Sequence, residues 1–113
     1  MIVMKKWRQT EDYTIRERIT LILTETKDPL TAEEIAILLR ENLTTKEVYE
    51  HLGHIAKSVR RNLPRYQLVM RPPYCKKCGY VFKDIRRPRK PSKCPRCKST
   101  WIAEPAFIII PRE

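Results

Sequence analysis

Three stretches in the first 63 residues place apolar side chains three and four positions apart, the spacing that lines one face of an α-helix. Each stretch opens with a threonine that is followed three residues later by a glutamate, the capping-box pattern of a helix start. These threonines are Thr14, Thr31 and Thr44. We therefore predict a helix that ends near Thr26, a short helix from residue 32, and a third helix over 45–63 that stops before Pro64.

Each predicted helix has one apolar face, and we expect these three faces to form the core of the protein. The inward residues are Ile15, Ile19, Ile22 and Leu23 in the first helix, Ile35, Leu38 and Leu39 in the second, and Val48, Leu52, Ile55 and Val59 in the third. Turns at 27–30 and 41–44 join the helices. Gly53 lies inside the third helix, where it costs about 1 kcal/mol relative to alanine.

Two later segments are rich in β-forming residues and predict strands at 66–70 and 106–110. If the second strand were unpaired, it would be an exposed apolar edge, which promotes aggregation. We therefore predict that the two strands pair antiparallel over the helices and leave the intervening segment at the tip of a hairpin. Shorter strands are expected at 80–82 and 101–103. The alternative is two tandem domains, with the last strand confined to the second.

The four cysteines form two pairs, and in each pair two residues separate the cysteines. The pairs are Cys75 with Cys78 and Cys94 with Cys97, and residues 79–93 lie between them. This spacing is typical of a tetrathiolate zinc site, because one tight turn aims both sulfurs of a pair at the same ion. Gly79 suits the positive φ of such a turn. Zn²⁺ takes four such ligands in a tetrahedron, which leaves no position for water, so we predict one structural zinc ion.

Two disulfides and a rubredoxin-like iron site are the alternatives for these cysteines. Disulfides are disfavoured because the sequence has no export signal, and an iron site would serve electron transfer, for which no redox-partner surface is apparent. The lobe at 75–104 has 30 residues, and segments of this size rarely fold without a disulfide, a metal ion or oligomerisation. We therefore expect the metal to be required for its folding.

The order of these elements predicts an α+β fold. Three helices followed by a β-hairpin form a winged helix-turn-helix, and the zinc ribbon is inserted at the wing. The predicted division is an N-terminal extension at 1–13, a winged helix-turn-helix at 14–70 and 105–113, and a zinc ribbon at 71–104. The apolar residues Ile2, Val3, Met4 and Trp7 of the extension are expected to pack onto the core or onto a second subunit.

The cysteine lobe also carries a family resemblance. Residues 74–83 (YCKKCGYVFK), 92–99 (SKCPRCKS) and 101–107 resemble archaeal predicted transcriptional regulators, in which a winged helix is fused to a rubredoxin-like zinc ribbon. The similarity extends forward to about Thr14, although the helical part matches mainly in pattern. The resemblance implies a zinc ribbon carried by the wing, and it implies DNA binding.

The charge of the chain points to a polyanionic partner. Lys and Arg number 24 against 13 Asp and Glu, a net charge of +11, and residues 71–100 hold eleven basic side chains and one acidic one. The charge favours nucleic acid first and an anionic membrane surface second. We expect double-stranded DNA as the partner and no membrane. No apolar run is longer than 106–110, which is far too short to span a bilayer, and no secretory segment is apparent, so we expect a cytoplasmic protein.

We predict two sets of nucleic-acid contacts, the polar face of the third helix and the basic loop between the cysteine pairs. They are Lys46, Glu50, Lys57, Arg60, Arg61, Arg65, Lys83, Arg86, Arg87, Arg89 and Lys90. The helix would enter the major groove, where Glu50 accepts a hydrogen bond from a cytosine amine, and the loop would hold phosphates. The alternatives are a solvated helix face and a solvated loop. Flanking Lys76, Lys77, Arg96 and Lys98 are equally suited to neutralising the thiolates.

Four aromatic residues of the ribbon, Tyr74, Tyr80, Phe82 and Trp101, could stack on bases, but core packing is favoured for most of them. His51 and His54 are expected to be polar surface residues. No glycine-rich phosphate loop and no nucleophile–histidine–carboxylate set is present, so we expect no catalysis. The leading function is a DNA-binding transcriptional regulator, with a homodimer possible. The alternatives are an RNA- or ribosome-associated zinc protein and an adaptor that docks on RNA polymerase.

Overall fold

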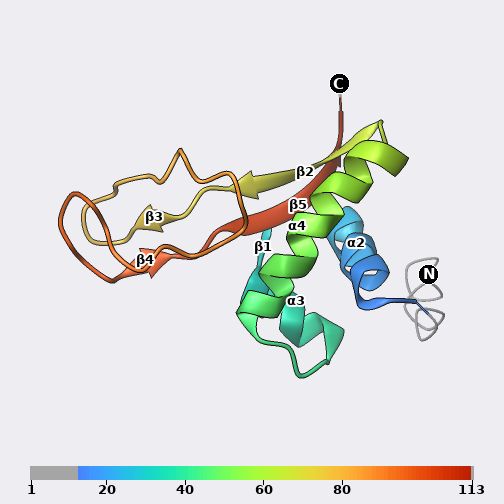
Figure 1. Cartoon of the computed structure of the whole chain (residues 1–113), viewed down its shortest axis with the longest axis horizontal. Coiled ribbons are helices and arrows are strands. Elements are labelled where there is room, and N and C mark those ends of the chain that lie inside the picture. The colour runs from blue at the N-terminus through green and yellow to red at the C-terminus, as the bar shows by residue number, and fades with distance from the viewer. Residues whose placement is uncertain (1–12, 113) are drawn as a thin grey trace.

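The computed structural model describes residues 13–112, so the predicted packing of the N-terminal extension lies largely outside the described residues. The described chain has a mixed α+β fold with three helices, an antiparallel sheet and a cysteine-containing ribbon (Figure 1). The helices are α2 (Ile15–Glu25), α3 (Ala32–Leu39) and α4 (Thr45–Asn62). The strands are β1 (Leu30–Thr31), β2 (Tyr66–Arg71), β3 (Tyr74–Cys75), β4 (Ile102–Ala103) and β5 (Ala106–Pro111).

All three predicted capping boxes are confirmed, each with both of its hydrogen bonds. At the start of α4, the backbone N–H of Glu47 donates to Oγ1 of Thr44 over 3.1 Å, and the backbone N–H of Thr44 donates to Oε1 of Glu47 over 2.9 Å. The backbone hydrogen bond from Thr44, followed by its side-chain bond, lowers the pKa of the Glu47 carboxyl. The box therefore stabilises α4 at neutral pH, and this contribution is lost as the pH falls through that lowered pKa.

Replacing Thr44 with alanine should lower the free energy of unfolding by about 1 kcal/mol, because the backbone N–H of Glu47 loses its hydrogen-bond acceptor, the Oγ1 of Thr44. Chemical denaturation followed by circular dichroism measures this change. The adjacent Thr45→Ala variant is the matched control, since Thr45 lies exposed inside the helix and alanine is the better helix former there. An equal loss in both variants would show that the cap contributes nothing of its own.

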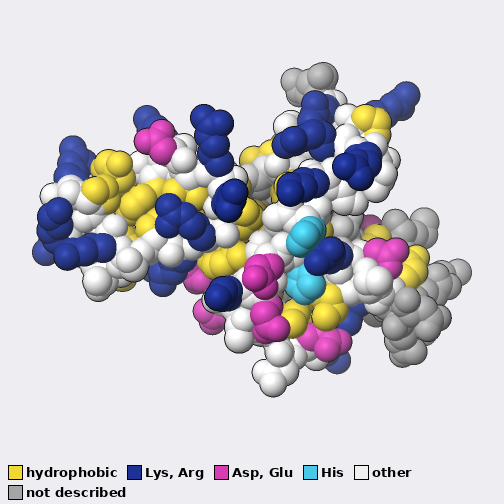
Figure 2. Space-filling view, in the orientation of Figure 1, with side chains coloured by type: hydrophobic (Ala, Val, Ile, Leu, Met, Phe, Trp, Pro, Cys, Tyr) yellow, Lys and Arg dark blue, Asp and Glu magenta, His cyan; other side chains and the backbone are white. Residues whose placement is uncertain are grey.

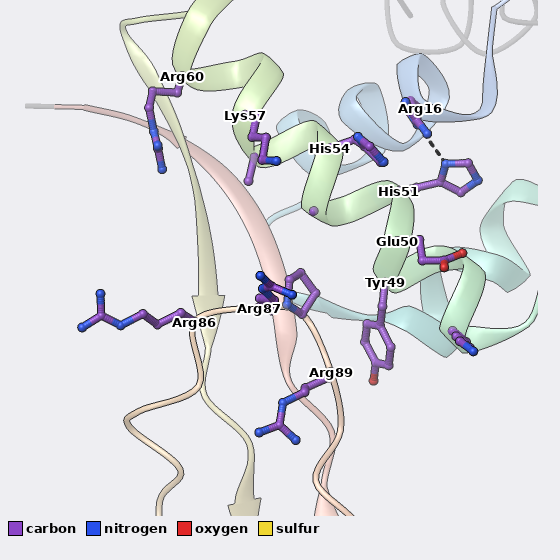
Figure 3. A pocket seen from close by; sticks show the side chains of 14 residues that line it. Arg16, Tyr49, Glu50, His51, His54, Lys57, Arg60, Arg86, Arg87 and Arg89 are labelled. Atoms are coloured by element: carbon purple, nitrogen blue, oxygen red, sulfur yellow. Dashed lines mark hydrogen bonds between the residues drawn. The ribbon is translucent and has the colours of Figure 1, made fainter.

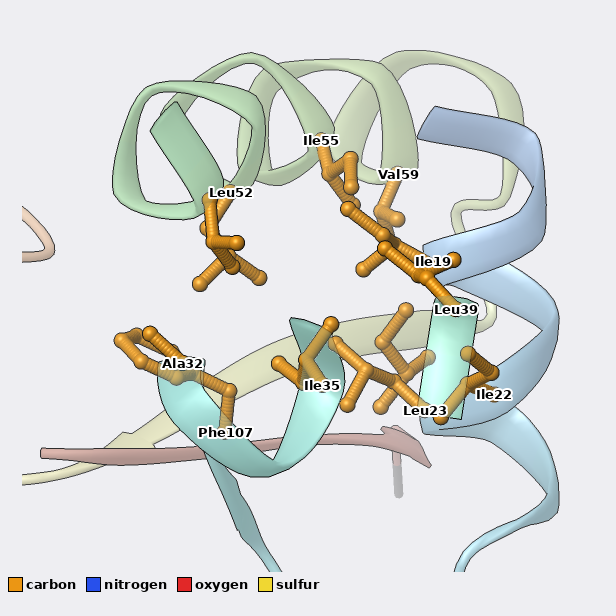
Figure 4. Packing of buried hydrophobic residues seen from close by; sticks show 12 residues of the cluster. Ile19, Ile22, Leu23, Ala32, Ile35, Leu39, Leu52, Ile55, Val59 and Phe107 are labelled. Atoms are coloured by element: carbon orange, nitrogen blue, oxygen red, sulfur yellow. The ribbon is translucent and has the colours of Figure 1, made fainter. Parts of the chain in front are cut away.

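The three helices pack on one face of a three-stranded sheet with the order β1-β5-β2 (Figures 1 and 4). β2 and β5 are antiparallel, with Leu68 opposite Ile109 and Met70 opposite Phe107, which confirms the predicted pairing. Phe107 is buried beneath the helices, and its ring contacts that of Tyr49 at a centroid distance of 6.3 Å. The core cluster comprises Ile19, Ile22, Leu23, Ala32, Ile35, Leu39, Val48, Leu52, Ile55, Val59, Phe107 and Ile109.

The ribbon leaves the sheet after β2 and returns at β5, and it projects to one side of the helices (Figure 1). It contains its own two-stranded sheet, in which Tyr74 of β3 lies opposite Ala103 of β4 and Cys75 lies opposite Ile102. A second small cluster fills its interior, formed by Cys75, Cys94 and Ile102 with Tyr80, Phe82 and Cys97 packed against them. The core of the ribbon is therefore separate from the core of the helices.

Three details of the predicted elements are wrong. Leu38 is 51% exposed, because only Ala32, Ile35 and Leu39 of the short helix α3 turn inward. The segment 80–82 forms a single bridge, between Val81 and Tyr74, instead of a strand. The predicted turn at 27–30 ends in a strand, since β1 pairs with β5 through Leu30 opposite Phe107. A two-residue strand such as β1 forms only because a strand far along the chain, β5, lies beside it.

Within residues 13–112, no helix combines the length and the apolar character that crossing a membrane requires.

Candidate metal centre and nucleic-acid interface

The four cysteines converge at the centre of the ribbon, as the spacing of the two pairs predicts. Their sulfur atoms all lie within 4.8 Å of one another, with 3.5 Å between Cys75 and Cys97 and 3.6 Å between Cys78 and Cys94. Four sulfurs at about 2.3 Å from a common ion would lie about 3.8 Å apart in a tetrahedron. The donor set therefore fits one structural Zn²⁺. All four cysteines are free, and their separations exceed the ~2.05 Å of a disulfide bond.

The backbone of both cysteine turns donates hydrogen bonds to sulfur. The N–H of Cys78 donates to Sγ of Cys75 over 3.4 Å, and the N–H groups of Arg96 and Cys97 donate to Sγ of Cys94 over 3.3 and 3.4 Å. Burial opposes ionisation of Cys75, yet the N–H groups of Cys78 and Lys77 lower its pKa to about 6. Against the effect of its burial, hydrogen bonds from the Cys97 and Arg96 N–H groups also help to lower the pKa of Cys94. The thiolate is the form that binds metal, so the two turns favour that form at Cys75 and Cys94.

The two cysteine turns close in the same way although their sequences differ. Gly79 follows the first pair with φ of 83°, which confirms the expected use of glycine there. Lys98 holds the corresponding position after the second pair and also has a positive φ, of 67°. A non-glycine residue in this region carries strain. The second turn is thus held by its surroundings, including the hydrogen bond from the Lys98 N–H to the carbonyl of Cys94.

A groove of about 940 Å³ separates α4 from the basic loop of the ribbon. One wall is the polar face of α4, and the other is the loop at 86–89, which folds back toward the helix (Figure 3). Seven basic side chains and one carboxylate line it; they are Arg16, Lys46, Lys57, Arg60, Arg86, Arg87, Arg89 and Glu50. Figure 2 shows Lys and Arg spread over the ribbon and along α4, with acidic side chains gathered nearer to α3. The groove is therefore a concentrated positive surface.

The basic side chains of the groove are available to a ligand. Within residues 13–112, none of them forms an ion pair with a carboxylate. By contrast, Arg18 of α2, outside the groove, forms an ion pair with Glu41 over 2.8 Å. Arg86, Arg87 and Arg89 are exposed, and so are Lys46, Lys57 and Arg60 across the groove. Positively charged side chains without carboxylate partners on both walls of a concave surface attract a polyanion.

Tyr49 connects the groove to the core. Its ring packs against Phe107, while its hydroxyl is buried and has no hydrogen-bond partner among the described residues. Burial raises the pKa of Tyr49 to about 12, and the charge of Glu104 acts in the same direction. The side chain is therefore neutral at any physiological pH and contributes shape to the groove.

The two histidines on α4, His51 and His54, line the groove, and within residues 13–112 they belong to no cluster of metal-binding side chains. The Nε of Arg16 donates a hydrogen bond to Nδ1 of His51 over 3.1 Å, which requires that nitrogen to be unprotonated (Figure 3). Burial, and then the charge of Arg16, lowers the pKa of His51. Its neutral form thus contributes stability at neutral pH, and protonation below the ordinary pKa of about 6.5 removes that contribution.

The structure brings many of the predicted nucleic-acid contacts together. Lys46, Glu50, Lys57, Arg60, Arg86, Arg87 and Arg89 line the groove, whereas Arg61, Arg65, Lys83 and Lys90 are exposed outside it. Seven lining residues were not among the predicted contacts, including Arg16 of α2 and Tyr49 of α4. No local pattern could reveal Arg16, because it is 35 residues away from its partner His51.

The expected core packing of the ribbon aromatics is correct for only half of them. Tyr80 and Phe82 pack edge to face in the ribbon interior, with centroids 5.1 Å apart. Trp101 is 60% exposed and Tyr74 is 39% exposed, so both lie on the surface.

Comparison with known proteins identifies relatives along most of the chain. A family model described as PF0610-like, N-terminal matches residues 14–68, and one described as PF0610 rubredoxin-like zinc beta-ribbon domain matches residues 72–111. The solution NMR structure of protein PF0610 from Pyrococcus furiosus is similar with a TM-score of 0.70 and 35% sequence identity, and the match covers 87% of this chain and 90% of that chain. Among curated proteins, no significant match was found.

Proposed function

This chain belongs to the PF0610-like family, and we propose that it is a zinc-containing regulator of transcription that binds double-stranded DNA. The observation that carries this proposal is the groove between α4 and the ribbon loop, with unpaired basic side chains on both walls. Such a surface suits a polyanion that has regularly spaced charges, and the phosphate backbone of DNA is one.

In this proposal the helical part is a winged helix-turn-helix in which α4 is the recognition helix and β2 and β5 are the wing. An α-helix is about 10–12 Å wide, close to the ~12 Å width of the major groove of B-DNA. With α4 in the major groove, the phosphate strand that borders it would lie between the helix and the loop. Lys57 and Arg60 would then contact this strand from one side, and Arg86, Arg87 and Arg89 from the other.

Base recognition would fall to the end of α4 that carries the fewest cations. Glu50 lines the groove as its sole carboxylate among the described residues, and it repels phosphate. A carboxylate is suited to accepting a hydrogen bond from the N4 amine of cytosine. Lys46, one turn earlier on the same face, is suited to the acceptors on guanine.

The salt dependence of binding tests this function. If the groove neutralises about six phosphates, the logarithm of the association constant for a random duplex should fall against the logarithm of salt with a slope of about −5. Fluorescence anisotropy of a labelled duplex from 50 to 300 mM salt measures it. A flat salt dependence would contradict the proposal, and preferential binding of ribosomal RNA fragments in direct competition would favour the RNA-associated alternative.

A further inference from the structure

The ribbon exposes an aromatic face that is separate from the groove. We define this face by Tyr74, Val81 and Trp101 with Lys76 beside them. Trp101 is 60% exposed, and Tyr74 and Val81 are 39% and 38% exposed. None of the four residues lines the groove between α4 and the loop. Duplex binding in the groove therefore leaves this face free.

Strand pairing places these side chains on one side of the ribbon. Tyr74 lies opposite Ala103 in β4 and bridges to Val81 on its other side, and residues directly opposite one another point to the same face of a sheet. One residue further along, Cys75 and Ile102 turn inward and are buried. The next pair, Lys76 and Trp101, is joined by the hydrogen bond from the Lys76 N–H to the Trp101 carbonyl over 2.9 Å. Its side chains return to the outer face.

Folding of the ribbon does not account for this exposure. Its interior is already filled by Tyr80, Phe82, Ile102 and the cysteines. An indole ring left 60% in water contributes little burial, and Trp101 could be replaced by a polar residue at small cost. Several exposed apolar side chains on one face, with polar residues around them, are typical of a binding surface.

The charge around this face indicates the kind of ligand. Nζ of Lys76 lies 5.8 Å from the centroid of the Trp101 ring. The surrounding segment, residues 71–100, carries eleven basic side chains and one acidic one. Aromatic rings set among cations bind single-stranded nucleic acid, because bases stack on the rings while the cations follow the backbone. A protein partner would instead need many carboxylates to match this segment.

We propose that the aromatic face binds unpaired bases of single-stranded DNA, with one base stacked on Trp101 and a neighbouring base on Tyr74. Adjacent phosphates contact Lys76 and the basic side chains next to it. Stacking tolerates every base, so this contact carries little sequence preference. The proposal takes DNA as the ligand from the proposed function, but it uses a surface that duplex binding in the groove does not need.

Fluorescence of Trp101 reports stacking directly. The chain has two tryptophans, Trp7 and Trp101, so in a Trp7→Phe background the emission comes from Trp101 alone. Titration of the zinc-loaded protein with oligothymidylate should quench this emission. The same oligomer length made entirely of abasic sites has the same phosphates without bases, and it should leave the emission nearly unchanged. Equal quenching by both oligomers, or quenching by neither, would overturn the proposal.

Affinity measurements on variants provide the second readout. Trp101→Ala should weaken binding of oligothymidylate about 5- to 150-fold, the range that corresponds to one lost base stack. Trp101→Phe should retain most of the affinity. The matched control is Tyr13→Ala, which removes an exposed aromatic residue at the start of α2, far from the ribbon in sequence. Equal affinities of the Trp101→Ala variant and the unmodified protein for oligothymidylate would overturn the proposal.

Three further measurements distinguish single-stranded DNA from other ligands of the aromatic face. The affinity of Trp101→Ala for duplex DNA should equal that of the unmodified protein. The test of single-strand binding by the aromatic face is therefore independent of the test of duplex binding in the groove. If Trp101→Ala weakened the binding of oligouridylate but not that of oligothymidylate, the ligand would be RNA and the proposal for DNA would be overturned. A change in self-association by sedimentation, with unchanged binding of oligothymidylate, would assign the face to a second copy of the chain and overturn it as well.

Discussion

Removal of zinc will unfold the ribbon while the three helices remain folded. With a strong chelator in excess, the β-signal of the ribbon and the dispersed amide resonances of residues 74–103 should disappear. The helical signal should persist, because the core cluster around Phe107 shares no residue with the cluster around the cysteines. Structural zinc supplies an apparent ~10–16 kcal/mol in small finger peptides, and no apolar contact in this ribbon is of that size.

Substitution of a single ligand tests the same dependence without a chelator. Cys94→Ser should lose zinc and unfold the ribbon, because a buried ligand is removed from the four-sulfur site. Lys93→Ser is the matched control, since Lys93 is exposed and adjacent but contributes no ligand. Zinc content by metal analysis and amide spectra of both variants measure the outcome. A ribbon that stays folded without metal would contradict the prediction.

Removal of the three groove arginines of the ribbon loop will weaken duplex DNA binding about 100-fold. Arg86, Arg87 and Arg89 are exposed and unpaired within the described chain, so a triple alanine variant should fold normally. Each exposed charge contact contributes up to about 1 kcal/mol, and three together correspond to about 100-fold in affinity. The salt slope should also fall by about 3, one for each phosphate released.

The control for this variant removes the same charge from another part of the ribbon. Lys77, Lys93 and Arg96 are exposed near the cysteines and do not line the groove. Their triple alanine variant should lose much less affinity in the same anisotropy titration. Equal losses would mean that only net charge matters and that the groove has no special role.

Substitution on α4, the opposite wall of the groove, should change the sequence preference of DNA binding. Lys46→Ala on α4 should change the ranking of duplex sequences selected from a random pool, because Lys46 is proposed to contact bases. A uniform loss across all sequences, like that of the loop variant, would mean that α4 only contacts phosphates.

Local sequence signals predicted most of the elements and the whole metal centre. The three threonine–glutamate boxes marked the helix starts, and each is present with both hydrogen bonds. The two cysteine pairs predicted the convergence of four sulfurs and the positive φ of Gly79. The capping boxes and each cysteine turn depend on chemistry within three or four residues along the chain. The two cysteine pairs lie further apart, but their convergence is predictable because one zinc ion takes four thiolates.

The pairing of β2 with β5 was predicted although the two strands are far apart in the chain, but other features that depend on distant partners were not. The pairing of β1 with β5 joins Leu30 to Phe107, and Trp101 faces outward because the strand register places it across from Lys76. Several of the basic side chains that the sequence predicted as nucleic-acid contacts do line one groove.

Only the tertiary structure decided where those charges meet. The helix starts and the apolar faces follow from the sequence by itself, because backbone capping and helical periodicity are short-range. The zinc ligands follow from it because the spacing of the two cysteine pairs is specific to a four-thiolate site. The groove exists because the pairing of β2 with β5 brings a loop near residue 87 back toward a helix that ends at residue 62. That placement is set by packing between segments far apart in the chain, and no local pattern of residues encodes it.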